Sequence, residues 1–217
     1  MLKTTEILIN AGLANKVFNN ADFKELFPGT AASRYGLLNK ALAKGEVLQL
    51  KRGAYILNQK YNNQKISKYY IASQIVPHSY VSLESALSFH GWIPEKVTVV
   101  SSVIHSGRSK SFLTEFGEFE YRFIPIQPYE FLTGVQRKTI DEQPFLIASG
   151  IRALLDLVYE KGYEWRGLDF IQESLRIEID NLKIISNTDY KDINNVYRSK
   201  RVLKFLQNML QELNIYD

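Results

Sequence analysis

The 217-residue chain contains no cysteine, which excludes disulfide bonds, thiolate metal sites and a cysteine nucleophile. Its three histidines, His78, His90 and His105, are too scattered for a metal-binding pair of the H-x-x-x-H type, so we expect structural or surface roles for them. No apolar run reaches the length of a membrane-spanning helix. The polar start, MLKTTEILINAGL, is not typical of a secretory signal. These features predict a cytoplasmic protein without a membrane partner.

Motifs for common enzyme chemistry are also missing. The chain has no glycine-rich phosphate loop and no G-x-S-x-G elbow that would expose a serine nucleophile. Ser79 or Ser82 is better interpreted as a helix N-cap, and Ser85 as a helix position. We therefore predict no catalytic residue, no metal and no cofactor.

One alternative to a non-enzyme lies in the segment Glu118-Phe119-Glu120-Tyr121-Arg122, which would put two carboxylates and an arginine on one side of a strand. Metal-dependent nucleases arrange acidic and basic residues in this way, which makes Glu118 and Glu120 candidate metal ligands. The competing interpretation is a cross-strand charge ladder on a half-exposed sheet. No partner aspartate stands shortly upstream, and an arginine replaces the lysine expected of such sites, which favours the ladder.

Positive charge is concentrated at the start of the chain. Residues 1–60 hold nine Lys or Arg and four Asp or Glu, a net charge of +5 that exceeds the +4 of the whole chain. Residues 61–150 are neutral overall, and residues 151–217 carry −1. A basic N-terminal region joined to a neutral remainder indicates a polyanionic partner for the basic part.

The order of predicted elements in residues 1–60 is three short helices followed by a hairpin. A helix over 3–13 precedes a second over 21–27, capped by Asn20, and Thr30 caps a third that runs to Gly45. Alternating residues over 47–57, with Gly53 at the turn, predict the hairpin. This order is typical of a winged helix-turn-helix, and the polar segment 58–65 predicts a domain boundary near residue 60.

The remainder, residues 61–217, is predicted to be a mixed α/β domain, so that the whole chain is α+β. Helices are expected over 65–76, 81–90 and 151–161 and at the end of the chain, where Val202 to Leu213 show the clearest amphipathic pattern. In the helix over 151–161, Ile151, Leu154, Leu155 and Val158 share one apolar face. Strands are expected over 98–104, 119–126 and 145–149, with a polar connection before 119 that includes part of a strand.

A helical wheel divides the third helix into two faces. Ala31, Tyr35, Leu38, Ala41 and Leu42 are predicted to pack on the first two helices, and Tyr55 is also expected in the core. Ser33, Gly36, Lys40 and Lys44 lie on the opposite face, with Asn39 and Leu37 on its borders. Glycine in a helix interior costs up to about 1 kcal/mol relative to alanine, which close approach of the backbone to DNA would offset.

These patterns predict a DNA-binding surface made of Ser33, Arg34, Asn39, Lys40, Lys44, Lys51 and Arg52. The lysines suit phosphate contacts, whereas Ser33, Asn39 and Arg52 suit base edges. Arg34 could reach a phosphate or simply cover the core. Any one of the lysines alone is better interpreted as a solvated charge. A possible additional basic surface at the start of the last helix comprises Arg198, Lys200, Arg201 and Lys204.

Four segments resemble, in order, blocks of the AbiEi-type antitoxin and transcriptional regulator family. They are KGEVLQLKRGAYIL (44–57), HSYVSLESALSFHGWIP (78–94), GEFEYRFIP (117–125) and IASGIRALLDLVY (147–159), so the match spans about residues 20–160. The family usually has a proline and charged residues where this chain has Gly150-Ile151-Arg152, and the tail after residue 165 is not matched.

The resemblance implies a transcriptional autorepressor and antitoxin of a type IV toxin–antitoxin operon, tied to abortive phage infection. Its winged helix would bind double-stranded DNA at inverted repeats in its own promoter. Its C-terminal domain would counter a nucleotidyltransferase-like toxin without a stable complex. Two alternatives stay open: the nuclease described above, and a protein-interaction module that does not read specific DNA.

Overall fold

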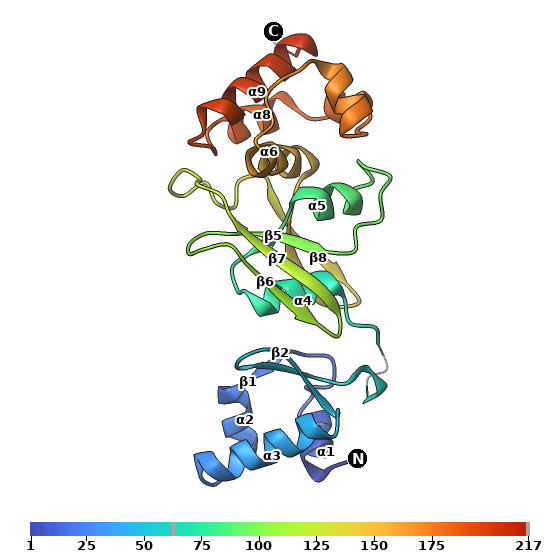
Figure 1. Ribbon diagram of the computed structural model, residues 1–217, viewed down its shortest axis with the longest axis vertical. Helices are drawn as coiled ribbons and strands as arrows, with labels where there is room; N and C mark the ends of the chain where they lie inside the picture. The colour runs from blue at the N-terminus through green and yellow to red at the C-terminus, as the bar shows by residue number, and fades with distance from the viewer. Residues whose placement is uncertain (62–63, 216–217) are drawn as a thin grey trace.

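The computed structural model describes residues 1–61 and 64–215. Residues 62–63, part of the polar segment expected at the domain boundary, lie outside the described residues, as do residues 216–217 at the end of the predicted second domain. The fold is α+β, and it is elongated, with the N-terminal elements at one end and the C-terminal helices at the other (Figure 1). No helix within the two described ranges is long and apolar enough to cross a membrane.

Residues 1–61, called here the N-terminal unit, contain three helices and a three-stranded sheet. These are α1 (Lys3–Asn10), β1 (Phe18–Asn19), α2 (Asn20–Leu26), α3 (Ala31–Ala43), β2 (Val47–Lys51) and β3 (Ala54–Leu57), with a 3-10 turn η1 (Gln59–Tyr61) at the end. The sheet is antiparallel in the order β1-β3-β2. The three helices and the hairpin are as predicted, whereas β1 was not predicted because only two residues pair.

The cap of α2 differs by one residue from the prediction. The Asn19 side chain, not that of Asn20, accepts hydrogen bonds from the Ala21 and Asp22 N–H groups. The Asp22 carboxylate accepts in return from the Asn19 N–H at 2.7 Å, which completes a capping box. Because Asn20 is left free of this task, it lies at the surface beside the β2–β3 turn, where its Nδ2 is 3.9 Å from the place of a Cβ on Gly53.

The β2–β3 hairpin is buried on both faces. Val47, Tyr55 and Leu57 pack on the helices of the N-terminal unit, in one hydrophobic cluster. Leu48, Leu50 and Ile56 belong instead to the larger cluster formed by the rest of the chain. The hairpin is thus a layer shared by both parts. That residues 1–60 form a domain separate from residues 61–217 stays a prediction.

Residues 64–215, called here the second unit, are built on a six-stranded mixed sheet in the order β6-β7-β5-β4-β9-β8. The strands are β4 (Tyr80–Val81), β5 (Val100–Ile104), β6 (Lys110–Thr114), β7 (Gly117–Phe123), β8 (Val135–Ile140) and β9 (Gln143–Ala148). The pairs β4–β9 and β5–β7 are parallel, and the others are antiparallel. Strands β5, β7 and β9 were predicted, whereas β4 and the exposed edge strand β8 were not.

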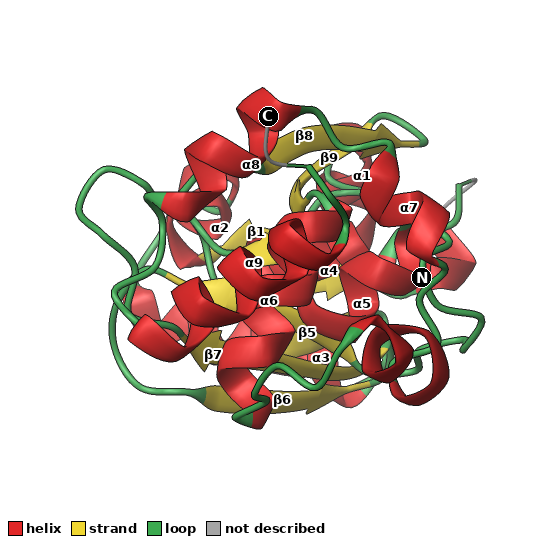
Figure 2. Ribbon diagram, turned by 90° about the horizontal axis from the view of Figure 1, so that it is seen from above, coloured by secondary structure: helices red, strands yellow, loops and turns green. Residues whose placement is uncertain are grey.

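The helices of the second unit pack against this sheet or against one another. They are α4 (Lys68–Ile75), α5 (Leu83–Phe89), α6 (Gly150–Lys161), α7 (Ile179–Lys183), α8 (Asn187–Asn194) and α9 (Lys200–Glu212), with a π-helical turn η2 (Phe170–Ser174). In the view down the long axis, α6 and α9 lie together near the centre (Figure 2). The predicted helices correspond to α4, α5, α6 and α9, and η2, α7 and α8 were missed.

Helix α6 is buried on all sides, although a one-faced helix was predicted. Every residue from Gly150 to Val158 is buried, because α5, α9 and β9 contact different sides of the helix. A Cβ on Gly150 would overlap the indole ring of Trp92, so the glycine permits this contact. The helix also buries a charged pair, Arg152 and Asp156, one turn apart.

This pair is surrounded by hydroxyl groups. The Asp156 carboxylate accepts from Ser82 at 2.6 Å, Tyr197 at 2.7 Å, Tyr80 at 3.0 Å and the Arg152 Nε at 3.2 Å. Burial alone would lower the pKa of the Arg152 guanidinium, but the adjacent carboxylate holds that pKa above its ordinary value. Burial raises the pKa of both tyrosines well above the ordinary value. The hydroxyls therefore stay neutral donors, and the network is a closed structural core.

Candidate nucleic-acid interface

Helix α3 carries most of the predicted DNA-binding residues, and its start is fixed by a cap. The Thr30 hydroxyl accepts from the Ser33 N–H at 3.2 Å, as predicted. Gly45, with φ +61°, follows the helix and turns the chain toward β2. Leu38 and Ala41 are buried against the N-terminal unit, which fixes the helix axis.

The packed face of α3 is rotated relative to the predicted one. Tyr35 was expected in the core but is 68% exposed, and Ala31 is exposed too. Leu37, placed on a border by the wheel, is partly buried against the same cluster as Leu38. The rotation arises because α1 and β2 contact α3 on this side, which the sequence periodicity does not indicate. Tyr55, by contrast, is buried as predicted.

Beside α3, the turn between β2 and β3 places Arg52 at the surface. Gly53 has φ +79°, a conformation that favours glycine, and the pairing shifts register between Gln49 and Lys51. Gln49 is exposed while its neighbours Leu48 and Leu50 are buried. The turn therefore presents amide and guanidinium groups on the side where α2 and α3 lie.

A groove of about 630 Å³ runs between α2, α3 and the β2–β3 hairpin. We call it the α2–α3 groove, and its lining residues are Asn20, Phe23, Lys24, Ala31, Arg34, Tyr35, Leu38, Asn39, Leu42, Gln49, Arg52 and Tyr55. The floor is apolar, and the rim is cationic or amide-bearing. None of these twelve residues, all of which the structure describes, is an aspartate or glutamate.

The groove brings together three of the predicted DNA-binding residues, Arg34, Asn39 and Arg52. Of these, Arg34 already makes one hydrogen bond within the protein, since its Nη1 donates to the Gly29 carbonyl at 2.6 Å. Sequence reasoning missed Lys24 and Gln49 as parts of the same surface. The alternation of Gln49 with two buried leucines was the available signal for an outward-facing amide.

The other predicted residues lie outside the groove. Ser33, Lys40 and Lys44 are exposed on the outer face of α3, as predicted, together with Gly36, where a Cβ would meet no atom within 4 Å. Lys51 is partly exposed at the end of β2. The candidate interface is thus the outer face of α3 and the adjoining α2–α3 groove.

A buried carboxylate of the N-terminal unit does not neutralise this surface. Glu46 follows α3 and accepts from the Leu2 N–H at 2.8 Å and the Thr5 hydroxyl at 2.5 Å. These hydrogen bonds hold the pKa of Glu46 below its ordinary value. The Glu46 carboxylate thus has its partners within the N-terminal unit, where these hydrogen bonds connect α1 to the start of β2.

One residue of the additional basic surface predicted at α9, Arg201, makes hydrogen bonds within the protein. Arg201 donates from its two terminal nitrogens to the carbonyls of Val158, Tyr159 and Tyr163 at 3.0–3.1 Å. These carbonyls lie at the C-terminus of α6, where a cation is favoured by the helix dipole. Arg201 therefore has a structural partner, whereas Arg198, Lys200 and Lys204 are exposed.

Charged residues of β7 form ion pairs rather than the predicted cross-strand ladder, because Leu113 and Ser111 of β6 lie opposite Glu118 and Glu120. Glu118, Glu120 and Arg122 alternate with the buried Phe119 and Tyr121. Arg122 pairs with Glu120 at 2.6 Å and with Glu160 of α6 at 3.4 Å. Within residues 1–61 and 64–215, no group of three or more His, Asp or Glu side chains is placed to hold a metal ion.

Ser82, Ser85 and His90 each have a partner within the protein. Ser82 is the N-cap of α5, but its hydroxyl binds Asp156 rather than the helix backbone. Ser85 donates to the Val99 carbonyl at 2.9 Å, and His90 lies 2.8 Å from the Ala148 carbonyl, where burial lowers its pKa. His78 and His105 are exposed and line a separate cavity.

Comparison of the chain with protein-family models and with curated protein sequences gives no match.

Proposed function

We propose that the protein is a DNA-binding transcriptional autorepressor and antitoxin, and that its N-terminal unit is a winged helix-turn-helix. The observation that carries the proposal is the α2–α3 groove beside the exposed face of α3. Its rim has cationic and amide groups without a carboxylate, in a chain whose excess positive charge lies in residues 1–60. The resemblance to AbiEi-type antitoxins supports the same function.

Double-stranded DNA is the partner that suits this surface best. A helix with small and basic side chains on its outer face fits a major groove, where Lys40 and Lys44 would contact phosphates. Asn39 and Arg52 carry the groups that pair with adenine and guanine edges. The β2–β3 turn would contact the backbone or the minor groove beside α3.

The role of the second unit is proposed on the resemblance alone. It would counter a nucleotidyltransferase-like toxin encoded next to it, without a stable complex and without enzymatic activity of its own. Acting on a promoter and on such a toxin would require the protein in the cytoplasm. Its own promoter, with inverted repeats, would be the binding site.

DNA binding is tested by fluorescence anisotropy with the gene's upstream region, a scrambled duplex and a salt series. We expect tighter binding to the promoter, and the pair Lys40→Ala with Lys51→Ala should reduce the salt slope by about two, because two phosphate contacts are lost.

Asn39→Ala should lower the preference for the promoter by about tenfold, since one base contact contributes about 1–3 kcal/mol. The matched control, Lys183→Ala with Lys191→Ala, removes two exposed lysines of α7 and α8 in the second unit. Equal binding to both duplexes would contradict specific reading.

The antitoxin role is tested by co-expression with the product of the neighbouring gene. We expect growth arrest by that product alone and rescue when this chain is co-expressed. Rescue should persist in the Lys40→Ala, Lys51→Ala variant, because the second unit is intact. No rescue by a stably expressed full chain would contradict the antitoxin role and leave the DNA-binding role standing.

A further inference from the structure

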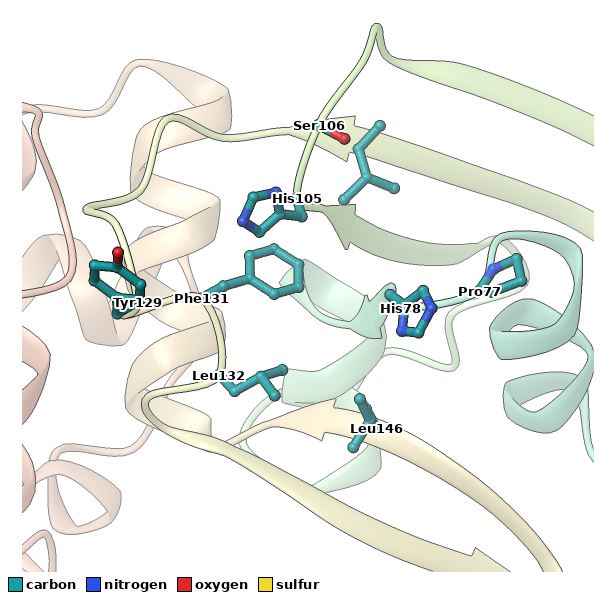
Figure 3. A pocket seen from close by; sticks show the side chains of 9 residues that line it. Pro77, His78, His105, Ser106, Tyr129, Phe131, Leu132 and Leu146 are labelled. Atoms are coloured by element: carbon teal, nitrogen blue, oxygen red, sulfur yellow. The ribbon is translucent and has the colours of Figure 1, made fainter.

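The second unit has a cavity of about 590 Å³ at one end of its sheet, distinct from the proposed DNA interface. Residues from four segments line it: Pro77 and His78 before β4, Ile104 to Ser106 at the end of β5, the loop residues Tyr129, Phe131 and Leu132, and Leu146 of β9. In the close-up, the rings of His105, Phe131 and His78 lie around one opening (Figure 3). The volume is typical of a site for a small organic molecule.

One wall of this cavity is held in place by the interior. Phe131 packs edge-on against the fully buried Tyr80 and also against His105, with ring centroids 5.0 Å apart in both pairs. The loop that carries Phe131 is anchored on both sides, by Gln127 N–H to the Val196 carbonyl and by Arg152 to the Thr133 carbonyl, each at 2.8 Å. The cavity is therefore preformed, and a ligand need not order this wall.

Two lining residues have unusual backbone conformations. His78 has φ +63° and Tyr129 has φ +70°, a region that histidine adopts more readily than most residues other than glycine but that tyrosine seldom adopts. Tyr129 is also fully exposed, so burial of its ring does not explain the conformation. Backbone strain of this kind is concentrated at ligand sites, because the surrounding structure must hold it.

The lining combines apolar side chains with polar groups that can donate hydrogen bonds. Pro77, Ile104, Leu132 and Leu146 are aliphatic, and the rings of Phe131 and Tyr129 offer aromatic faces or edges. The polar groups are two imidazoles and hydroxyls, and none of the nine lining residues, all described, is acidic. Glu130, on the same loop as Tyr129 and Phe131, accepts from the Thr133 hydroxyl at 2.6 Å. Donors set in an aromatic wall are complementary to an anion on a flat ring.

We propose that this cavity binds a small aromatic carboxylate, with the ring against Phe131 and the carboxylate between His78 and His105. The inference is independent of the proposed DNA-binding function, because it rests on residues of the second unit alone. A ligand of this class occupies the apolar walls with its ring and satisfies the imidazole donors with its charge. A neutral ligand of the same shape would leave the second interaction weaker.

The chain's three histidines allow a direct test by NMR. The imidazole Hε1 resonances of the full chain, assigned with His105→Phe and His78→Asn, are followed during titration with 1-naphthoate and with its neutral counterpart 1-naphthamide. Asparagine is chosen at position 78 because it tolerates a positive φ. We expect 1-naphthoate to shift the His78 and His105 resonances and to leave His90 unmoved, because His90 lies outside the cavity against Ala148.

The affinities give the second readout. The carboxylate should bind about tenfold more tightly than the amide, the factor expected of a hydrogen bond to a charged group. His105→Phe keeps an aromatic ring beside Phe131 and removes the donor, so it should weaken 1-naphthoate by about tenfold and 1-naphthamide by clearly less. Ser111→Ala, an exposed site on β6, is the control and should change neither.

Three outcomes would overturn the inference. The first is no shift of His78 or His105 at about 1 mM probe, a concentration that detects even weak sites. The second is equal affinity for the acid and the amide, or an equal shift of His90, either of which indicates unselective binding. The third is a shift of the cavity histidines on diluting the protein without probe, which would identify a second copy of the chain as the occupant.

Discussion

At the scale of single residues, Arg152 and Asp156 carry opposite charges in the interior and hold several elements together. Arg152 donates to Tyr80 of β4 and to the loop carbonyl of Thr133, and Asp156 accepts from Tyr197 beyond α8. The Arg152 guanidinium also faces the rings of Tyr80 and Tyr197. Since the polar atoms of this pair have hydrogen-bond partners on several elements, loss of one charge should destabilise the second unit.

Arg152→Met should therefore lower the free energy of unfolding by about 3–5 kcal/mol, because it leaves Asp156 as an unpaired buried charge. Adding Asp156→Asn should recover part of that loss, since the amide carries no unpaired charge and its single oxygen still accepts from one of the hydroxyls, Tyr197 or Ser82. Urea denaturation of the single and double variants measures both effects. Lys183→Met, which removes an exposed ion pair to Asp180, is the control and should change stability by less than about 1 kcal/mol. Simple additivity of the two core substitutions would contradict the coupling.

Glu46 gives a pH dependence at the residue scale. Its pKa is held below the ordinary value by the Leu2 N–H and the Thr5 hydroxyl, so the ionised form stabilises the folded state. That contribution is complete above the ordinary carboxyl pKa and is lost as the pH falls through the lowered folded-state pKa.

We expect Glu46→Gln to be less stable than the unsubstituted chain at neutral pH, with a gap that narrows below about pH 4.5. Urea midpoints of the two proteins between neutral and acidic pH measure this gap. A gap that stays constant over the whole range would contradict the assignment, because the stabilisation would then not depend on the carboxylate.

At the scale of elements, α3 combines a packed side with an exposed one that contains Gly36. The glycine is helical, exposed, and has open space around it, so nothing within the free protein requires it. Its absence of a side chain instead fits close approach of another molecule. Lys40, one turn later, lies on the same exposed side.

Gly36→Ala should raise the stability of the free protein by up to about 1 kcal/mol, because alanine is the better helix former. The same substitution should weaken promoter binding if the outer face of α3 enters the DNA groove. Thermal unfolding and the anisotropy assay measure the two effects. Gln207→Ala, at an exposed position of α9, should stabilise slightly without any effect on DNA binding. Unchanged promoter affinity in Gly36→Ala would contradict this docking of α3.

At the scale of the whole molecule, the β2–β3 hairpin joins the two units. Leu48, Leu50 and Ile56 are buried in the cluster of the second unit, and β2 lies against β6. The hairpin that carries Arg52 is therefore fixed relative to the six-stranded sheet. This arrangement predicts that the N-terminal unit depends on the second unit for solubility.

Residues 1–61 expressed alone should self-associate, because an apolar face of the hairpin becomes exposed. The triple substitution Leu48→Thr, Leu50→Thr, Ile56→Thr should return that fragment to a monomer, since it makes the uncovered face polar. In the full chain the same three changes should lower stability by more than about 3 kcal/mol. Sedimentation of the fragments and urea denaturation of the full chain measure these effects. A monomeric, unsubstituted fragment would contradict the shared-layer arrangement.

Local features of this protein followed from the sequence by itself. The Thr30 cap, the glycine turn at Gly53, the hairpin and the amphipathic pattern of α9 each depend on residues close together in the chain. The exposed amide and lysines of α3 were also placed correctly. Such features are set by backbone preferences and by hydrophobic periodicity, which a single sequence contains.

Only the tertiary structure decided which side of α3 packs, what Arg201 binds, why α6 is buried on all sides, and that Gln49 and Lys24 border one groove with Arg52. Each of these depends on contacts between segments distant in the sequence, as between Arg201 and the end of α6 some forty residues earlier. A periodic pattern identifies an apolar face but not the direction from which its partners approach. That direction is set by how the elements pack together, and it determines which polar side chains are brought to one surface.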